Sequence, residues 1–297
     1  MNQWTTCIAH NTSEGHLLTS GQGAAMFDCG MLFCAGETIR LARHALNGLQ
    51  PTHLFASHTH YDHIGALPAL RAVWPGIQLV TSAIGAEILQ KETPRRVIRE
   101  MNQTASQTYA PEVPVNLDYD DDAFRADLIV KEGDTVRVGD CTVEIIETPG
   151  HTRDTLSFFV RETGVLSLSE TSCVLLPDGS VYPGYLISFR QAIASIEKCR
   201  RVPYRTLSLP HRGIMGDAID EHFLDTAYEA TVACHDFILE QHAKGLDEPG
   251  ILEAYDQRYG TESLLAFQPK EAFYMNARAT IACTLREMRE EEAIPQA

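Results

Sequence analysis

Three histidines and an aspartate lie within six residues of one another, at His58, His60, Asp62 and His63. They directly follow a predicted strand at 53–57. Because alternate side chains of an extended chain point to the same side, His58 and His60 should project together. The two residues that follow them should face a second position as the chain turns. Imidazole nitrogen and carboxylate oxygen suit zinc, iron or manganese. The run therefore predicts a metal site, with histidines satisfied by ordinary hydrogen bonds as the weaker alternative.

Three further candidate ligands follow other predicted strands. His151 comes after a Pro-Gly turn that closes one strand, and His211 closes another strand in the same manner. Glu170 stands directly after a predicted strand at 165–169. Taken alone, a glutamate at a strand end is usually solvated. A single histidine there is equally often a metal ligand and an ordinary residue. Four strand ends that carry histidine or acid together indicate one metal site.

Aromatic residues follow Glu170 along the chain, at Tyr182, Tyr185 and Phe189. They are candidates for contacts with the substrate at the mouth of the site. The alternative for each of them is an ordinary place in the core or at the rim of the fold. The pattern alone slightly favours that alternative.

These motifs resemble the metallo-β-lactamase superfamily, and the likeness spans residues from about 20 to 215. The resemblance implies an αββα sandwich of the α/β class, with two metals at one edge of its sheets. The ligands that it implies are His58, His60 and His151 for the first metal, and Asp62, His63 and His211 for the second.

The resemblance also gives roles to two acidic residues. Asp28, at the end of a predicted strand, matches the aspartate that supports the histidine loop in the family and is not a ligand. Glu170 matches the residue that bridges the two metals, which in the family is normally aspartate in a Gly-Asp pair. Glutamate is one methylene longer, so either the strand end retreats or the carboxylate binds differently. Asp154 and Asp178 are poorer substitutes by their positions in the sequence.

His63, in the fourth position of the motif, is similar to the residue found in glyoxalase II and its relatives, the quinolone-signal response thioesterases. The implied function is that of a binuclear metal-dependent hydrolase that cleaves an ester, thioester or related acyl bond of a small molecule. A hydroxide held by two divalent ions, zinc or iron with manganese as a third choice, would attack the carbonyl. Asp62 is the catalytic candidate, because it would take or orient the proton of this nucleophile. A thiolate leaves without a proton, so a thioester is less demanding than an amide.

Three other functions stay open. The first is a metal-binding regulatory or interaction protein with weak or vestigial hydrolysis, which Glu170 slightly favours and the other six ligands oppose. A nuclease of the same fold is disfavoured by the formal net charge of -16, because an acidic surface repels phosphate. A diiron oxygen-reducing enzyme would carry an acid in place of His60.

The composition indicates a globular protein of a reducing compartment. With 297 residues, 44% of them hydrophobic, the chain can bury one substantial core, with or without a smaller appended part. Its start lacks the order of a secretory signal, and its apolar runs are only long enough for strands. The eight cysteines include no CxxC pair and are typical of reduced thiols in the cytoplasm. Neither nucleic acid nor a membrane is expected as a partner, and a homodimer is left open.

Two regimes of sequence pattern surround the candidate ligands. Short β-rich runs alternate with helical patterns up to about residue 215, and the chain is helical from about 218. We therefore expect a catalytic domain over 1–216 and a helical extension over 217–297 that caps the active site. The predicted strands are 23–27, 53–57, 78–81, 135–138, 142–147, 155–160, 165–169 and 206–209. The predicted helices are 37–49, a short one after His63, 83–91, 189–200 with Ser188 as N-cap, 221–244, 250–259 and 270–292.

The interval 93–124 fits neither regime. It is polar, with three prolines and an acidic run that includes Asp118 and Asp120 to Asp122. We expect a solvated excursion there, with a metal or ligand patch, or a lid over the site, as the alternatives.

Overall fold

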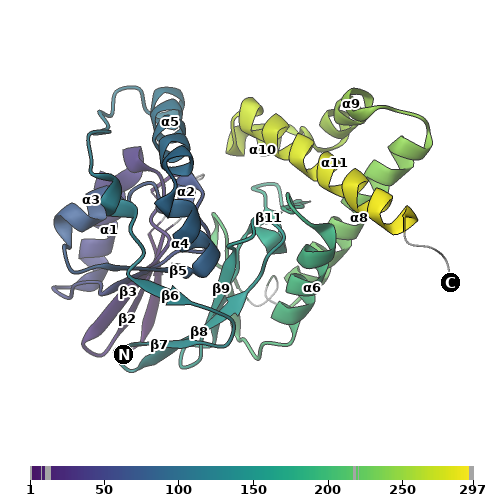
Figure 1. The fold of residues 1–297 in the computed structure, drawn as a ribbon. Helices are drawn as coiled ribbons and strands as arrows, with labels where there is room; N and C mark the ends of the chain where they lie inside the picture. Colours follow the sequence, from purple (N-terminus) through teal and green to yellow (C-terminus); the bar gives the residue numbers. More distant parts are fainter. Residues whose placement is uncertain (1, 8, 11–14, 217–218, 220, 294–297) are drawn as a thin grey trace. The chain divides into compact units, whose positions relative to one another are not determined.

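The computed structural model describes residues 2–7, 9–10, 15–216, 219 and 221–293 (Figure 1). The chain forms two compact units, each of which is assembled from separate stretches of sequence. The first unit comprises Met1–Glu147, Asp154–Leu168 and Pro203–Gly216. The second unit comprises Thr148–Arg153, Ser169–Val202 and Asp217–Ala297.

The first unit contains a six-stranded sheet in the order β1-β2-β3-β4-β5-β6. The first three strands pair antiparallel, and the strands from β3 to β6 pair in parallel. Parallel neighbours need crossover connections, and here these are helical. The strands are β1 (Gln3–Thr6), β2 (His16–Ser20), β3 (Gly23–Phe27), β4 (His53–Phe55), β5 (Gln78–Ser82) and β6 (Leu128–Val130). The connecting helices are η1 (Leu32–Cys34), α1 (Ala35–Leu46), α2 (Tyr61–Ile64), α3 (Leu67–Val73), α4 (Ala83–Gln90), α5 (Glu92–Tyr109) and η2 (Asp121–Phe124).

A second six-stranded sheet, in the order β14-β13-β10-β9-β8-β7, also belongs to the first unit. All its neighbours are antiparallel except β10 and β13, which pair in parallel. Its strands are β7 (Thr135–Val138), β8 (Cys141–Glu147), β9 (Leu156–Val160), β10 (Val165–Ser167), β13 (Thr206–Leu209) and β14 (Gly213–Ile214).

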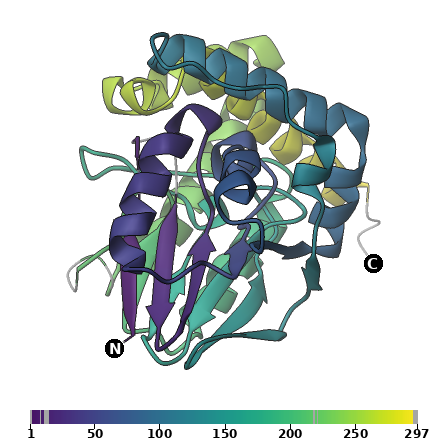
Figure 2. The same ribbon diagram turned by 90° about the vertical axis from the view of Figure 1, so that its left-hand side faces the viewer.

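The two sheets share a buried apolar core. Phe27 and Phe55 of the first sheet stack with ring centroids 4.9 Å apart, and Phe158 of the second sheet meets both edge-on. The other face of the first sheet buries apolar side chains against α1, α3, α4 and α5 in a separate cluster. Figure 2 shows α1 running alongside the N-terminal strands, drawn in purple like the helix. The first unit is therefore a layered structure of helices, sheet and sheet.

The second unit is mainly helical. Its described residues form a short hairpin and a set of helices, packed around a cluster that is rich in tyrosine and phenylalanine. Its elements among the described residues are η3 (Glu170–Ser172), β11 (Val174–Leu175), β12 (Val181–Tyr182), α6 (Phe189–Arg200), α8 (Phe223–Ala243), α9 (Glu248–Tyr259), α10 (Glu262–Phe267) and α11 (Lys270–Glu292). Within the described ranges, every helix is too short or too polar to cross a membrane.

Most predicted elements occur at the predicted places. Three of the eight predicted strands match their observed bounds, and α6 begins at Phe189 with the Ser188 hydroxyl accepting a hydrogen bond from the Gln191 amide. The strand predicted at 165–169 ends at Ser167, so Glu170 opens the short helix η3 instead of ending a strand. The sequence patterns did not predict the helix α10 or the strands β1, β2, β6, β11, β12 and β14.

The expectation of a solvated excursion over 93–124 was wrong for its first half. Residues there form α5, which has 18 residues. Its buried stripe includes Ile98, Asn102 and Ala105, and the asparagine in the middle interrupts the apolar pattern that would have revealed the helix. The Asn102 side chain accepts a hydrogen bond from the Leu32 amide at 2.7 Å, which explains why a polar residue is buried there. The boundary at 216 and the capping role of the tail stay predictions.

Candidate metal centre

Two buried carboxylates hold the backbone of the histidine loop in the first unit. After β4, the Ser57 amide donates to Asp28 Oδ1 at 2.7 Å, and the Thr59 amide donates to Asp154 Oδ2 at 2.9 Å. Both aspartates are nearly inaccessible to solvent. Hydrogen bonds from backbone amides to ionised acceptors are among the stronger ones in proteins. The loop that carries His58 is therefore fixed on either side of this residue.

The helix α2 begins inside the motif, with His60 as its N-cap residue. It carries Asp62 and His63 on its single turn, so these two side chains leave the extended direction of the loop. The Nδ1 atom of His63 lies 2.9 Å from Asp28 Oδ2. A carboxylate can only accept, so Nδ1 carries the proton and Nε2 presents a lone pair. The Nε2 atom lies 3.8 Å from Asp62 Oδ2.

Four imidazole rings of the first unit form a chain of neighbours. The ring centroid of His58 is 4.5 Å from that of His60 and 4.1 Å from that of His63. The His211 ring, which follows β13, has its centroid 5.1 Å from that of His63. The backbone φ angles of His211 and Asp28 are 60° and 51°. Non-glycine residues rarely adopt such angles, and they cluster at functional sites.

The other two candidate ligands, His151 and Glu170, belong to the second unit and lie next to the backbone of Gly184. The His151 amide donates to the Thr171 hydroxyl at 3.0 Å, and His151 Nδ1 lies 2.6 Å from the Gly184 carbonyl oxygen. A carbonyl can only accept, so this histidine also keeps its proton on Nδ1 and turns Nε2 outward. Glu170, the first residue of η3, is 5% exposed.

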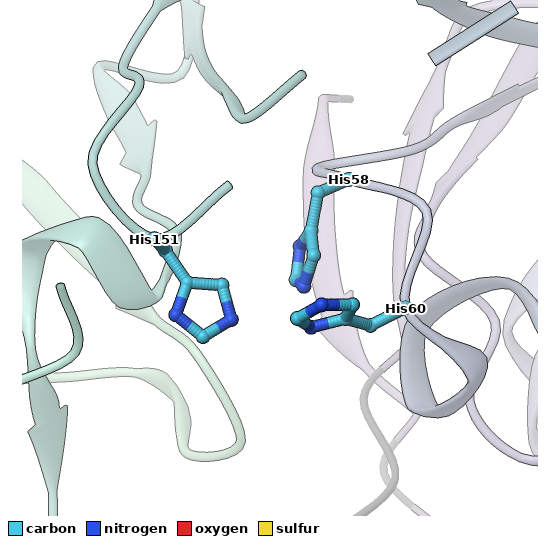
Figure 3. Close-up of side chains that lie close together, drawn as sticks. All are labelled: His58, His60 and His151. Carbon is cyan, nitrogen blue, oxygen red and sulfur yellow. The ribbon is translucent and has the colours of Figure 1, made fainter. Parts of the chain in front are cut away.

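The candidate ligands fall into two groups. Within each group, one ligand atom of every residue lies within 4.8 Å of those of the others. Figure 3 draws the three rings of the first group. A set of three imidazoles, and a set of two imidazoles with two carboxylates, both suit a divalent ion such as zinc, iron or manganese. The donor chemistry of these residues therefore fits the implied metals. The groups are His58, His60 and His151, and Asp62, His63, Glu170 and His211.

The remaining candidates belong to neither ligand group. Tyr182 and Tyr185 are buried in the core of the second unit, and Phe189 is partly buried, with its ring stacked on that of His235 at 3.8 Å. Contact of these three residues with a substrate stays a prediction. Asp178 accepts hydrogen bonds from Ser180 in its own turn.

Two supporting groups escaped the sequence reasoning. Asp154 was weighed only as a substitute ligand, although it holds the Thr59 amide. The Gly184 carbonyl, which supports His151, is a backbone group and leaves no trace in a side-chain pattern.

The family model described as metallo-beta-lactamase superfamily matches residues 16–211. A hydroxyacylglutathione hydrolase of Rhodospirillum rubrum is 27% identical over 163 residues, which cover 52% of this chain and 46% of that protein. A second protein of this name, from Rhodopseudomonas palustris, is 48% identical over only 46 residues, 16% of this chain and 18% of its own. The chain thus spans half or less of these relatives.

Solved structures show the same fold at low sequence identity. A beta-lactamase domain protein from Burkholderia ambifaria matches 100% of this chain and 88% of its own with a TM-score of 0.64 and 15% identity. A metallo-beta-lactamase family protein from Thermus thermophilus matches 99% of this chain and 95% of its own, with a TM-score of 0.58 and 17% identity. These likenesses concern the fold alone, and they confirm the predicted fold class with its C-terminal helical region.

Proposed function

Because this chain belongs to the metallo-beta-lactamase superfamily, we propose that it is a hydrolase with a two-metal site that cleaves an ester, thioester or related acyl bond of a small molecule. The observation that carries the proposal is the pair of ligand groups, one of three imidazoles and one with two carboxylates. In this proposal, His58, His60 and His151 hold the first metal. The second metal is held by Asp62, His63 and His211, with Glu170 between the two.

Divalent cations bound in such a site lower the pKa of water toward neutrality and polarise a carbonyl oxygen. The residues of the chain supply orientation and charge for this chemistry. Asp62 is the carboxylate that accepts or orients the proton of the attacking water, because it is the partly exposed acid of its group. Asp28 keeps the proton of His63 on Nδ1, so that Nε2 stays available as a ligand.

A thioester is the acyl bond that these residues favour. A thiolate leaves without receiving a proton, whereas an amide nitrogen needs a general acid. Two relatives of this chain are named hydroxyacylglutathione hydrolases, which supports the same choice.

Metal binding and hydrolysis of a generic thioester test the proposal together. We expect the parent protein to bind two zinc or two iron ions per chain and to hydrolyse S-acyl thiocholine or acyl-thiol esters of graded length. The variants His58→Ala and His211→Ala should each lose one metal and nearly all turnover. The exposed His44→Ala, which changes a histidine of α1 outside both groups, is the matched control and should keep both. A parent protein that binds less than one metal after metal-replete growth would contradict the proposal.

A regulatory or interaction protein with vestigial hydrolysis is the second candidate. The observation in its favour is Glu170, which stands where the family normally has aspartate and which opens a short helix after the strand has ended. If this second candidate is correct, the protein will bind two metals in the same experiment. It will then hydrolyse none of the esters faster than a metal-depleted sample does.

A further inference from the structure

The C-terminal helix α11 is bonded to the backbone segment that supports His151. We propose that Tyr185, held by Thr280 and Thr284 of α11, is a positioning residue that fixes the Gly184 carbonyl and through it the imidazole of His151. The inference rests on the proposed function, because it concerns the first of the two metal groups. It assigns to the helical tail a part in building the metal site.

The first step is the contact between Gly184 and the two candidate ligands of the second unit. The Gly184 carbonyl oxygen lies 2.6 Å from His151 Nδ1, a short distance for a hydrogen bond from a ring nitrogen. A side chain at this position would collide with the carbonyl oxygen of Glu170, so the residue must be glycine. Close packing on this side fixes where the backbone can lie. This packing alone does not fix the direction of the Gly184 carbonyl, which also depends on how Tyr185 is held.

The second step is the anchoring of Tyr185 at both of its ends. The Thr280 hydroxyl lies 3.0 Å from the backbone carbonyl of Tyr185 and also 3.0 Å from the Asn276 carbonyl of its own helix, so its single proton is shared between two acceptors. The phenol oxygen of Tyr185 lies 2.9 Å from the Thr284 hydroxyl. The tyrosine is fully buried, and the two threonines are 1% and 0% exposed. Such buried hydroxyl bonds hold their partners because breaking one leaves a polar group without water.

The third step is the arrangement of the anchor itself. Thr280 and Thr284 are four residues apart on α11 and therefore lie on the same face of the helix. The Thr284 hydroxyl also donates to the Thr280 carbonyl at 2.9 Å. The same helix is tied to the start of α6, where the Ser188 hydroxyl donates to Glu287 Oε1 at 2.6 Å. The segment from Gly184 to Ser188 is thus fastened to one rigid element.

Substitution of Thr280 separates a positioning role from a packing role. Thr280→Val removes the hydroxyl and keeps the shape, and Thr280→Ser keeps the hydroxyl and removes the methyl group. Loss of an outer partner of a metal-binding histidine costs about 10–100-fold in metal affinity. Because Thr280 acts on that partner through Tyr185, we expect Thr280→Val to weaken the binding of one zinc ion by about tenfold, the lower end of this range, and Tyr185→Phe to weaken it by less. Thr280→Ser should restore the affinity.

The measurement is competition for zinc against a chelator, with the visible spectrum of the cobalt-substituted protein as a second readout of ligand geometry. Tyr274→Phe is the matched control, because it removes a 2.7 Å hydroxyl bond to Asp256 elsewhere in the second unit. Urea unfolding of the metal-free proteins reports general damage. The control should lose stability like the others and keep the affinity for both metals.

A double-mutant cycle shows whether the effect passes through His151. In the His151→Ala background, Thr280→Val should cause no further loss of zinc affinity. Equal losses with and without His151, or a Thr280→Ser variant as weak as Thr280→Val, would overturn the inference and leave the proposed function intact. A Thr280→Val protein that binds zinc as tightly as the parent would also overturn the inference and leave the proposed function intact. A parent protein that binds no metal would instead overturn the proposed function, and the inference with it.

Discussion

At the scale of single residues, the candidate site depends as much on supporting carboxylates as on ligands. Asp28 serves two partners at once, since one oxygen accepts the Ser57 amide and the other faces His63 Nδ1. It does so from a backbone conformation that asparagine, aspartate and glycine tolerate better than other residues. The loop and the second metal group are therefore coupled through one side chain.

Replacing this carboxylate should damage metal binding selectively. In Asp28→Asn, one amide group must serve both partners, and an NH₂ group turned toward His63 would displace the proton from Nδ1 to Nε2. We expect the second metal to bind about 10–100-fold more weakly, with a smaller loss for the first. Chelator competition measures both affinities. Asp178→Asn, in an exposed turn, is the control, and an Asp28→Asn protein that titrates like it would refute the role.

The bridge assigned to Glu170 gives a second prediction at this scale. Glu170→Gln removes the negative charge and should weaken the second metal by more than the roughly 100-fold that loss of an outer partner costs. The first metal, with its three histidines, should be much less affected. Glu170→Asp should keep both metals, because it keeps the carboxylate. Metal titration of the two variants decides the matter, and tight binding of two metals by Glu170→Gln would make Glu170 an ordinary buried glutamate.

At the scale of elements, the sequence predicted what periodicity and turn residues encode. The strands 23–27, 135–138 and 206–209 are rich in apolar and β-branched residues and lie between turn signals, and these were correctly placed. The helix α5 was missed because its buried face includes Asn102, whose partner is a backbone amide 70 residues away. No local pattern reports such a partner.

The candidate ligands were found for the opposite reason. His58, His60, Asp62 and His63 are adjacent in sequence, and their chemistry is visible without any fold. The supports of the site could not be predicted in the same way. Asp154 reaches the Thr59 amide across 95 residues, and the Gly184 carbonyl has no side chain to mark it.

The role of Asn102 can be tested at this scale. Asn102→Ala leaves the Leu32 amide without its acceptor and opens a space against Gly65, which packs directly on the asparagine side chain. A buried donor left in this way costs about 1–3 kcal/mol, so the free energy of unfolding should fall by that amount. Urea denaturation measures it. Gln103→Ala, at the neighbouring exposed position of α5, should change stability by less than about 0.5 kcal/mol, and equal losses would contradict the explanation.

At the scale of the whole molecule, buried thiols set a limit on stability at high pH. All eight cysteines are buried as reduced thiols. Burial raises the pKa of Cys7 from 9.0 to about 11, and it raises that of Cys234 to about 11 as well. Above pH 9 the unfolded chain loses thiol protons that the folded chain retains. The free energy of unfolding should therefore be unaffected by these thiols below pH 8 and fall between pH 9 and pH 11.

The contribution of one thiol can be isolated with Cys7→Ala, because burial alone causes the shift of Cys7. The slope of unfolding free energy against pH should become shallower in this variant by up to about 1.4 kcal/mol per pH unit. Urea denaturation at pH 8, 9, 10 and 10.5 provides the comparison with the parent protein. Parallel curves for the two proteins across this range would show that Cys7 ionises equally in the folded and unfolded states.

The chain passes five times between the two units, and this has a consequence for biosynthesis. The last piece of the first unit ends at Gly216, whereas the core of the second unit needs side chains as late as Leu285. During synthesis, residues such as Val174 and Leu176 therefore stay exposed until the ribosome has made α8 to α11. At about 5–20 residues per second, that wait lasts on the order of 5 to 20 seconds. A nascent chain of this protein thus carries an unburied apolar hairpin for long enough to be recognised by chaperones.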